Sequence, residues 1–137
     1  FHFMGYLPYP EMLKVLQISS AHIYLTVPFV LSWSMMESMA CECAMVCSRT
    51  APVLEVIKDG ENGLLADFFS PREVADKVHQ ILDHPDRMRD MRKAARKTVI
   101  HKYALKKLLP LHMGLVRDVA AKKFPPPTAE KINALYE

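Results

Sequence analysis

The residues with the clearest potential for chemistry lie in one stretch, 28–41, at a predicted turn from a strand into a helix. Ser32, Trp33 and Ser34 are the expected start of that helix. The first N–H groups of a helix lack partners within it and lie at the positive end of its dipole. Such a helix start can bind an anion, and a diphosphate is well suited to it. We therefore predict that the backbone N–H groups of Ser32, Trp33 and Ser34 are free to hold phosphate.

Glu37 follows about one helical turn later and has two interpretations. If Ser34 caps the helix, Glu37 is the third helical residue, and the pair forms a capping box in which the carboxylate returns to the Ser34 N–H. Alternatively, the carboxylate accepts hydrogen bonds from the ribose hydroxyls of a nucleotide. The two roles are compatible, because a capping glutamate can also face a ligand.

Three segments around this stretch predict a β-α-β unit. Residues 22–27 are β-branched and aromatic, which favours a strand. Residues 34–40 lack glycine and proline and carry three methionines, which favours a helix packed on several sides. Residues 44–48 form a short apolar run that is typical of a buried strand. In such a unit the helix begins at the carboxyl end of the first strand, where ligands bind.

The rest of the chain adds elements of the same kinds. We expect strands over 1–4 and 63–66, helices over 11–18 and from 71 onwards, a helical turn over 54–57, and an amphipathic segment over 105–119 that is interrupted at Pro110. Ser70 and Glu73 predict a second capping box, and residues 74–82 place apolar side chains on one face. The expected fold is α/β, with a mostly parallel sheet of about four strands and flanking helices.

Composition excludes several function classes. The net charge of +3 is small for a nucleic-acid-binding protein, and the basic segment 86–107 lacks interleaved aromatic residues, so we predict no nucleic-acid partner. No apolar run approaches the roughly 18 residues that cross a bilayer, and no signal peptide is visible, which favours a cytoplasmic location. Cys41, Cys43 and Cys47 match no zinc pattern, so we expect buried free thiols and no metal site.

Several motifs in order resemble those of the group 1 (family 4) glycosyltransferases with the GT-B fold. Residues 37–41 match the E-A-M-A-C segment of that family, and residues 48–55 match its S-x-x-G-G-x-P-E segment. Residues 56–65 contain a D-G-x-N-G element, and Gly5 matches the end of an F-x-G strand. The resemblance covers about residues 1–105. It implies a partial Rossmann-like domain, the later part of the C-terminal, donor-binding domain.

The resemblance also implies an activity and roles for individual residues. It implies a retaining, hexosyltransferase-type enzyme that moves a sugar from a UDP- or GDP-sugar to an unknown acceptor, without a metal or other cofactor. The roles that it implies fall on Glu37 at the ribose, Tyr6 and Leu7 at the base, and Ser32, Trp33 and Ser34 at the diphosphate. The first glutamate of the family motif falls on Phe29, which cannot accept a hydrogen bond from the donor sugar. A family glycine falls on Glu42.

In the family, two further strands come before the segment that corresponds to Phe1 onwards. The resemblance implies that these strands carry a basic pair that contacts the donor phosphates. We therefore expect an open sheet edge, a homo-oligomer, and no full catalysis by these residues alone. The competing hypothesis is a non-catalytic module that binds a partner or an anionic membrane surface through this edge or through the basic segment 86–107. The basic segment has the simpler interpretation of a solvated helix face. We expect domain boundaries at 1–123 for the nucleotide-sugar-binding part and 124–137 for a proline-rich spacer with a short helix.

Overall fold

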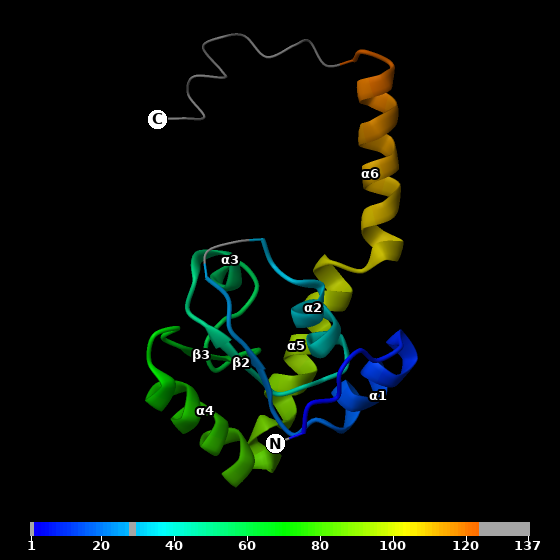
Figure 1. Ribbon diagram of the computed structural model, residues 1–137. Coiled ribbons are helices and arrows are strands. Elements are labelled where there is room, and N and C mark those ends of the chain that lie inside the picture. The colour runs from blue at the N-terminus through cyan, green and yellow to red at the C-terminus, as the bar shows by residue number, and fades with distance from the viewer. Residues whose placement is uncertain (1, 28–29, 124–137) are drawn as a thin grey trace. The chain divides into compact units, whose positions relative to one another are not determined.

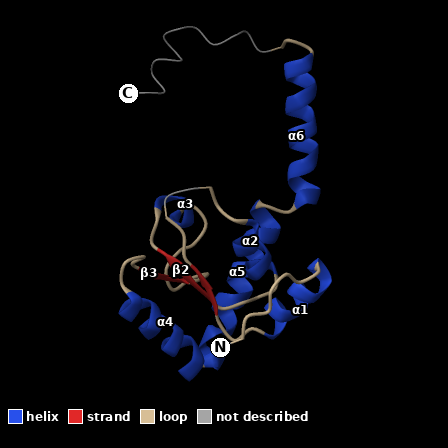
Figure 2. Ribbon diagram, viewed as in Figure 1, coloured by secondary structure: helices blue, strands red, loops and turns tan. Residues whose placement is uncertain are grey.

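The computed structural model describes residues 2–27 and 30–123, which form two compact units divided between Lys102 and Tyr103 (Figure 1). The elements of the first unit are α1 (Tyr9–Ile18), β1 (His22–Tyr24), α2 (Trp33–Ala40), β2 (Met45–Ser48), α3 (Ala51–Leu54), β3 (Leu64–Ala66), α4 (Pro71–Asp83), a 3-10 turn η1 (Pro85–Met88) and α5 (Arg89–Lys102). The second unit contains α6 (Leu105–Ala120). Figure 2 shows helices and strands alternating through the first unit, as the sequence predicts.

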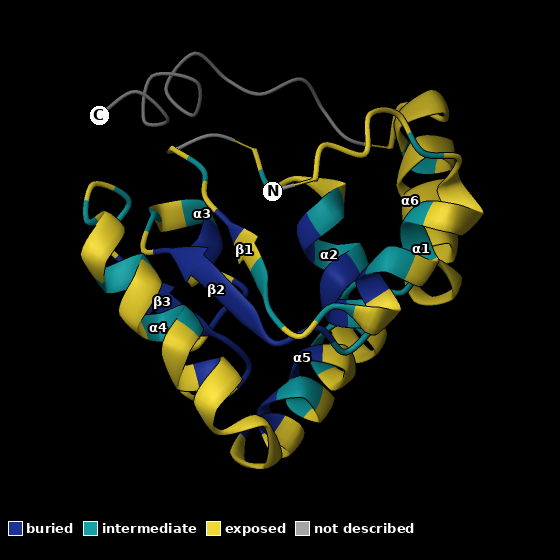
Figure 3. Ribbon diagram, turned by 60° about the horizontal axis from the view of Figure 1, so that its bottom comes forward, coloured by how far each residue is buried: buried dark blue, intermediate teal, exposed yellow. Residues whose placement is uncertain are grey.

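The strands form a parallel three-stranded sheet in the order β1-β2-β3. Ile23 lies opposite Val46, and Val46 lies opposite Leu64. The sheet stands between α4 on one side and α1 and α2 on the other (Figures 1 and 3). The predicted α/β class, the parallel pairing and the β-α-β unit are therefore confirmed. All strands of this sheet present their carboxyl ends at one edge, where the predicted turn into α2 lies.

Three local predictions are wrong. Among the described residues, 2–4 belong to no strand, because no neighbouring strand offers them hydrogen bonds, and the sheet has three strands instead of about four. The helical turn expected over 54–57 is α3, which begins earlier because Pro52 suits a first helical turn. α6 continues through Pro110, an exposed position where water can satisfy the carbonyl that loses its partner.

The core is built on both sides of β2 (Figure 3). Met35 and Met39 of α2 and Met45 of β2 are fully buried. On the α4 side, the buried apolar cluster consists of Ala44, Val46, Leu64, Ala66, Ile81, Met88 and Met91. Val74 and Val78 pack against this cluster, which confirms most of the predicted apolar face of α4. The spacing of buried and polar side chains along α2 and α4 thus determines which face of each helix packs on the sheet.

α4 begins at the predicted cap. The Ser70 hydroxyl accepts a hydrogen bond from the Glu73 backbone N–H at 3.2 Å. The Glu73 carboxylate does not return to Ser70. It accepts instead from the Asp67 N–H at 2.9 Å and pairs with Arg49 at 3.3 Å. Only half of the predicted capping box forms, and Glu73 holds the loop that follows β3.

The C-terminus of α2 ends in a left-handed residue, Glu42, with φ of 60°. The Cys43 N–H bonds to the Ser38 carbonyl and the Glu42 N–H bonds to the Met39 carbonyl, the pattern of a Schellman cap. On α5, Arg92 donates to the Glu42 carbonyl at 2.6 Å and Arg96 donates to the Ala40 carbonyl. Two arginines of the basic segment 86–107 therefore satisfy the carbonyl end of α2, where positive charge is favourable.

Glycine at position 42 should suit this cap better than a residue with a Cβ. We expect Glu42→Gly to be more stable than Glu42→Ala by about 1 kcal/mol, because both lose the carboxylate and only glycine adopts positive φ without strain. Urea unfolding of the two variants measures this difference. Equal stability would show that position 42 carries no backbone strain. Relative to the unchanged chain, both variants also lose the half-exposed ion pair between Glu42 and Arg96, which lowers their stability by a similar small amount.

The cysteines are free, as predicted, and two of them are buried. Burial raises the pKa of Cys47 to about 12 and that of Cys43 to about 11, from an ordinary value of 9.0. At a pH between the ordinary thiol pKa of 9.0 and the raised pKa of the folded thiol, the unfolded thiol has lost its proton and the folded thiol keeps it. The free energy of unfolding should therefore fall as pH rises above about 9, by up to about 1.4 kcal/mol per pH unit and thiol. Cys47→Ala should flatten this slope more than Cys41→Ala, because Cys41 is only partly buried.

Candidate functional site

The loop from β1 into α2 is held by two hydroxyl groups at the carboxyl edge of the sheet. The Tyr24 hydroxyl accepts a hydrogen bond from the Ser32 N–H at 2.9 Å. The Ser48 hydroxyl, at the end of β2, accepts from the Thr26 N–H at 3.0 Å and donates to the Thr26 carbonyl at 2.9 Å. Because both ends of the loop are bonded to side chains of the sheet, the start of α2 is held in a defined place.

α2 begins one residue earlier than predicted, and Ser32 is its cap. The Ser32 hydroxyl accepts from the Ser34 N–H at 3.2 Å and lies 2.9 Å from the Ser34 hydroxyl. The proposed cap at Ser34 is therefore wrong, and so is the capping box with Glu37. The prediction of free N–H groups is also wrong for Ser32 and Ser34, since Tyr24 and Ser32 occupy them. For Trp33 it stays a prediction.

Glu37 is the fifth residue of α2 and is half-buried. A side chain this far into the helix cannot cap its N-terminus, so the capping-box interpretation of Glu37 is wrong. Hydrogen bonding to the Glu37 side chain and the charge of Glu37 raise the pKa of Tyr9, at the start of α1, above its ordinary value. The structure thus brings the N-terminal end of α1 beside the carboxylate that the sequence singles out.

The predicted base-flanking residues precede α1. Gly5 has φ of 62°, so the chain turns sharply where the family motif places its glycine. Tyr6 is 96% exposed and Leu7 is half-buried. Trp33 is also largely exposed, at 84%. Phe29 lies outside the described residues. The exposed Tyr6 ring is open for stacking.

Sequence reasoning missed three residues of this arrangement. Tyr9, Tyr24 and Ser48 each place a hydroxyl group against the turn or against Glu37. Tyr24 and Ser48 read as ordinary members of buried strands. The one available signal was that Ser48 lies at the end of its predicted strand, where a side chain can reach a neighbouring loop, whereas Tyr24 lies inside the predicted strand 22–27.

The D-G-x-N-G element is structural. The Asn62 amide donates to the Val56 carbonyl at 2.9 Å and to the Thr98 hydroxyl at 3.1 Å, and its oxygen accepts from the Lys58 N–H at 2.7 Å. Asp59 accepts from the Leu65 N–H at 2.8 Å. Asn62 is 3% exposed. These bonds consume the polar groups of the motif, so they tie the turn before β3 to α5.

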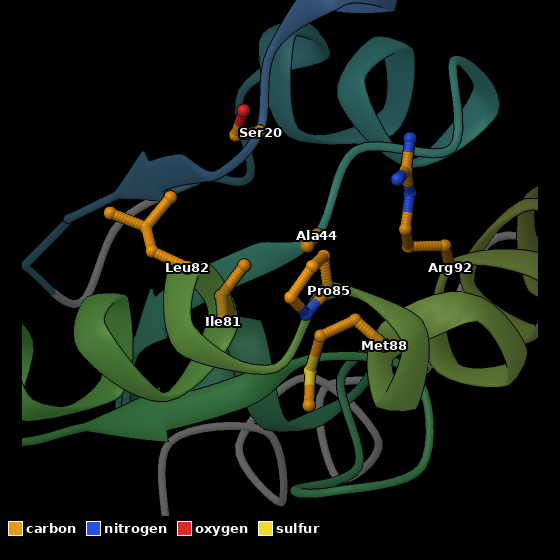
Figure 4. Close-up of a pocket in the computed structure, with 7 residues that line it drawn as sticks. All are labelled: Ser20, Ala44, Ile81, Leu82, Pro85, Met88 and Arg92. Atoms are coloured by element: carbon orange, nitrogen blue, oxygen red, sulfur yellow. The ribbon is translucent and has the colours of Figure 1, made fainter.

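A cavity of about 190 Å³ lies elsewhere (Figure 4). It is lined by Ser20, Ala44, Ile81, Leu82, Pro85, Met88 and Arg92. Ala44 precedes β2, so this cavity adjoins the amino end of the sheet, opposite the edge that carries Ser32 and Glu37. In folds of this kind ligands bind at the carboxyl ends of the strands. The cavity therefore does not belong to the candidate site.

Two further properties of the described residues concern metal ions and membranes. Residues 2–27 and 30–123 contain no group of three histidine, cysteine, aspartate or glutamate side chains placed to hold a metal ion. Across the same residues, none of the helices combines the length and the apolar character that crossing a membrane requires.

Known proteins are similar to this chain in sequence and in fold. N-acetyl-alpha-D-glucosaminyl L-malate synthase of Bacillus anthracis is 28% identical over 85 residues, 62% of this chain and 22% of that protein. The structure of a TarM variant of S. aureus in complex with Fondaparinux, alpha-GlcNAc-glycerol and UDP has a TM-score of 0.69 at 21% identity, over 83% of this chain and 23% of that chain. Anabaena Alr3699/HepE in complex with UDP has a TM-score of 0.67 at 13% identity, over 77% and 29%.

The chain spans less than a third of the length of each of these relatives. Its α/β fold corresponds to part of the GT-B glycosyltransferases. The family model for glycosyl transferases group 1 matches residues 1–98, which is most of the chain. With the ordered motifs around Glu37 and Asn62 in the expected elements, this chain belongs to the group 1 glycosyltransferases.

Proposed function

We propose that this chain supplies the donor-nucleotide site of a retaining glycosyltransferase that transfers a sugar from a UDP- or GDP-sugar to an acceptor. The observation that carries the proposal is the start of α2 at the carboxyl edge of a parallel sheet, with Glu37 just over one turn further on. Two solved relatives with this fold are in complex with UDP, which supports a nucleotide at this edge.

The start of α2 offers the diphosphate three donor groups. The Trp33 N–H lies at the positive end of the helix, and the hydroxyls of Ser32 and Ser34 can rotate away from their mutual contact to donate to phosphate oxygens. Such donors stabilise negative charge that develops on a departing diphosphate. Transfer then needs no protein nucleophile. Glu37 accepts hydrogen bonds from the ribose, and Tyr6 and Leu7 flank the base.

Calorimetric titration of the purified chain with UDP, GDP and ADP, without added metal, tests this proposal. We expect saturable binding of UDP or GDP and no comparable binding of ADP. Circular dichroism on the same sample shows that the chain is folded. A folded chain that binds none of the three nucleotides would contradict a donor site in this chain.

A second function, association through the sheet edge, is favoured by the surface of β1. β1 lies at one end of the sheet order, so its outer backbone groups have no strand partner among the described residues. Ile23, Leu25 and Val27 are each about half exposed, and residues 22–27 contain no charged lysine, arginine or carboxylate that would discourage pairing. We propose that a second copy of this chain pairs with β1, while contact with anionic membranes through the basic segment stays an untested alternative.

Replacing Leu25 by lysine should shift this chain from dimer to monomer. A lysine directly after the edge strand β1 charges the pairing surface and should weaken association at least tenfold. Sedimentation equilibrium of the unchanged chain and of Leu25→Lys measures the shift. Leu54→Lys is the matched control, since Leu54 is 49% exposed on α3, away from the strand. A monomeric unchanged chain would contradict pairing through β1.

A further inference from the structure

The hydroxyl group of Tyr24 joins the buried sheet to the exposed start of α2. Tyr24 is the last residue of β1 and is only 8% exposed, so its ring is anchored in the core. Its hydroxyl oxygen accepts the hydrogen bond from the Ser32 N–H at 2.9 Å, and Ser32 itself is exposed. The phenol therefore places a polar atom directly at the cap of α2, where the diphosphate site is proposed.

The hydroxyl hydrogen of Tyr24 has no partner in the part of the chain that the structure describes. The oxygen is an acceptor toward Ser32, and across residues 2–27 and 30–123 no other oxygen accepts the hydrogen in return. A largely buried O–H group costs free energy when it is left without an acceptor. An oxygen atom of a ligand bound at the start of α2 would satisfy it.

This arrangement makes the phenol a relay for the helix start. The Ser32 N–H lies at the positive end of the α2 dipole, and its bond to Tyr24 keeps it from touching a ligand directly. A hydroxyl whose oxygen accepts a hydrogen bond becomes a stronger donor, because hydrogen bonds in a chain polarise one another. The relay ends in a donor, so it suits a charged group that only accepts, such as a phosphate oxygen.

We propose that Tyr24 is a diphosphate-binding residue of the donor site, which accepts the Ser32 N–H and donates its hydroxyl hydrogen to a phosphate oxygen. The inference rests on the proposed nucleotide site. It adds a donor from the sheet to the three donor groups of α2. The phenol keeps its proton throughout, so its role is binding and involves no covalent step.

The test compares a nucleotide with its nucleoside. UDP and uridine are titrated by nuclear magnetic resonance, which also measures weak affinities, into the full unchanged chain and into Tyr24→Phe. Phenylalanine keeps the buried ring and removes only the hydroxyl. We expect Tyr24→Phe to weaken UDP binding about tenfold and to change uridine binding by less than about twofold, because uridine carries no phosphate. Tyr103→Phe, in the second unit, is the matched control and should leave both affinities unchanged.

A second measurement follows the hydrogen bond without a ligand. Amide hydrogen exchange at Ser32 should be about tenfold faster in Tyr24→Phe than in the unchanged chain, because the N–H loses its acceptor. The Leu65 N–H, which bonds to Asp59 at 2.8 Å, should exchange at the same rate in both. Equal exchange at Ser32 would overturn the inference, as would a Tyr24→Phe loss that is equal for UDP and uridine.

The outcomes separate this inference from the proposed function. If the unchanged chain binds UDP and Tyr24→Phe binds it equally well or more tightly, the nucleotide site stands and the phosphate role of Tyr24 is overturned. If the unchanged chain binds no nucleotide, the proposed function fails, and the phosphate role of Tyr24 fails with it. A selective loss of UDP affinity in Tyr24→Phe supports both.

Discussion

Glu37→Ala should weaken nucleotide binding about tenfold to a hundredfold and change the free energy of unfolding by less than about 1 kcal/mol. The ribose hydroxyls would lose a charged acceptor, and hydrogen bonds to charged groups are stronger than neutral ones. Stability should change little, because Glu37 is the fifth residue of α2 and makes no cap. Calorimetric titration gives the affinity, and urea unfolding gives the stability.

Glu55→Ala is the matched control for this experiment. Glu55 is an exposed glutamate at the end of α3, so its removal makes the same change of charge on another helix. We expect its nucleotide affinity to equal that of the unchanged chain. A Glu37→Ala variant that binds nucleotide normally and loses more than about 1 kcal/mol of stability would assign Glu37 a purely structural role.

Asn62→Ala should cost about 2 to 4 kcal/mol of stability. The substitution leaves the Lys58 N–H and the Val56 carbonyl without their partner and removes the bond to Thr98 on α5. Asn62 is buried, so water cannot replace these bonds without opening the turn. Urea unfolding of the variant measures the loss. At a temperature where the variant is still folded, its nucleotide affinity should be unchanged.

Glu61→Ala controls for the turn itself. Glu61 neighbours Asn62 and makes only an exposed ion pair with Lys58, so its removal should cost less than about 0.5 kcal/mol. If Asn62→Ala had normal stability but no longer bound nucleotide, the prediction of a structural role would be wrong. That outcome would make the D-G-x-N-G element a ligand site instead of a structural turn.

The order of elements could be read from local patterns. Residues 22–27 and 44–48 carry strand-forming side chains, and 34–40 suit a helix on a spacing that buries Met35 and Met39. Helix and strand periodicity is a property of neighbours in the chain, so a single sequence shows it. The cap of α4 at Ser70 was predictable for the same reason. The cap of α2 was misplaced by two residues, because the serines at 32 and 34 are equally good caps and only the bonds of the Ser32 N–H to Tyr24 and of the Ser34 N–H to Ser32 distinguish them.

The sequence by itself determined the α/β class, the ordered family motifs and the importance of Glu37. Only the tertiary structure decided what each polar group does. The Ser48 hydroxyl bonds to the Thr26 carbonyl, and Asn62 reaches Thr98 on α5, contacts that no local spacing encodes. The strand expected over 1–4 is absent from the described residues 2–4, because a strand exists only where a neighbour accepts its hydrogen bonds. Pattern therefore predicts the elements, while packing between distant segments assigns the hydroxyls, carboxylates and amides their partners.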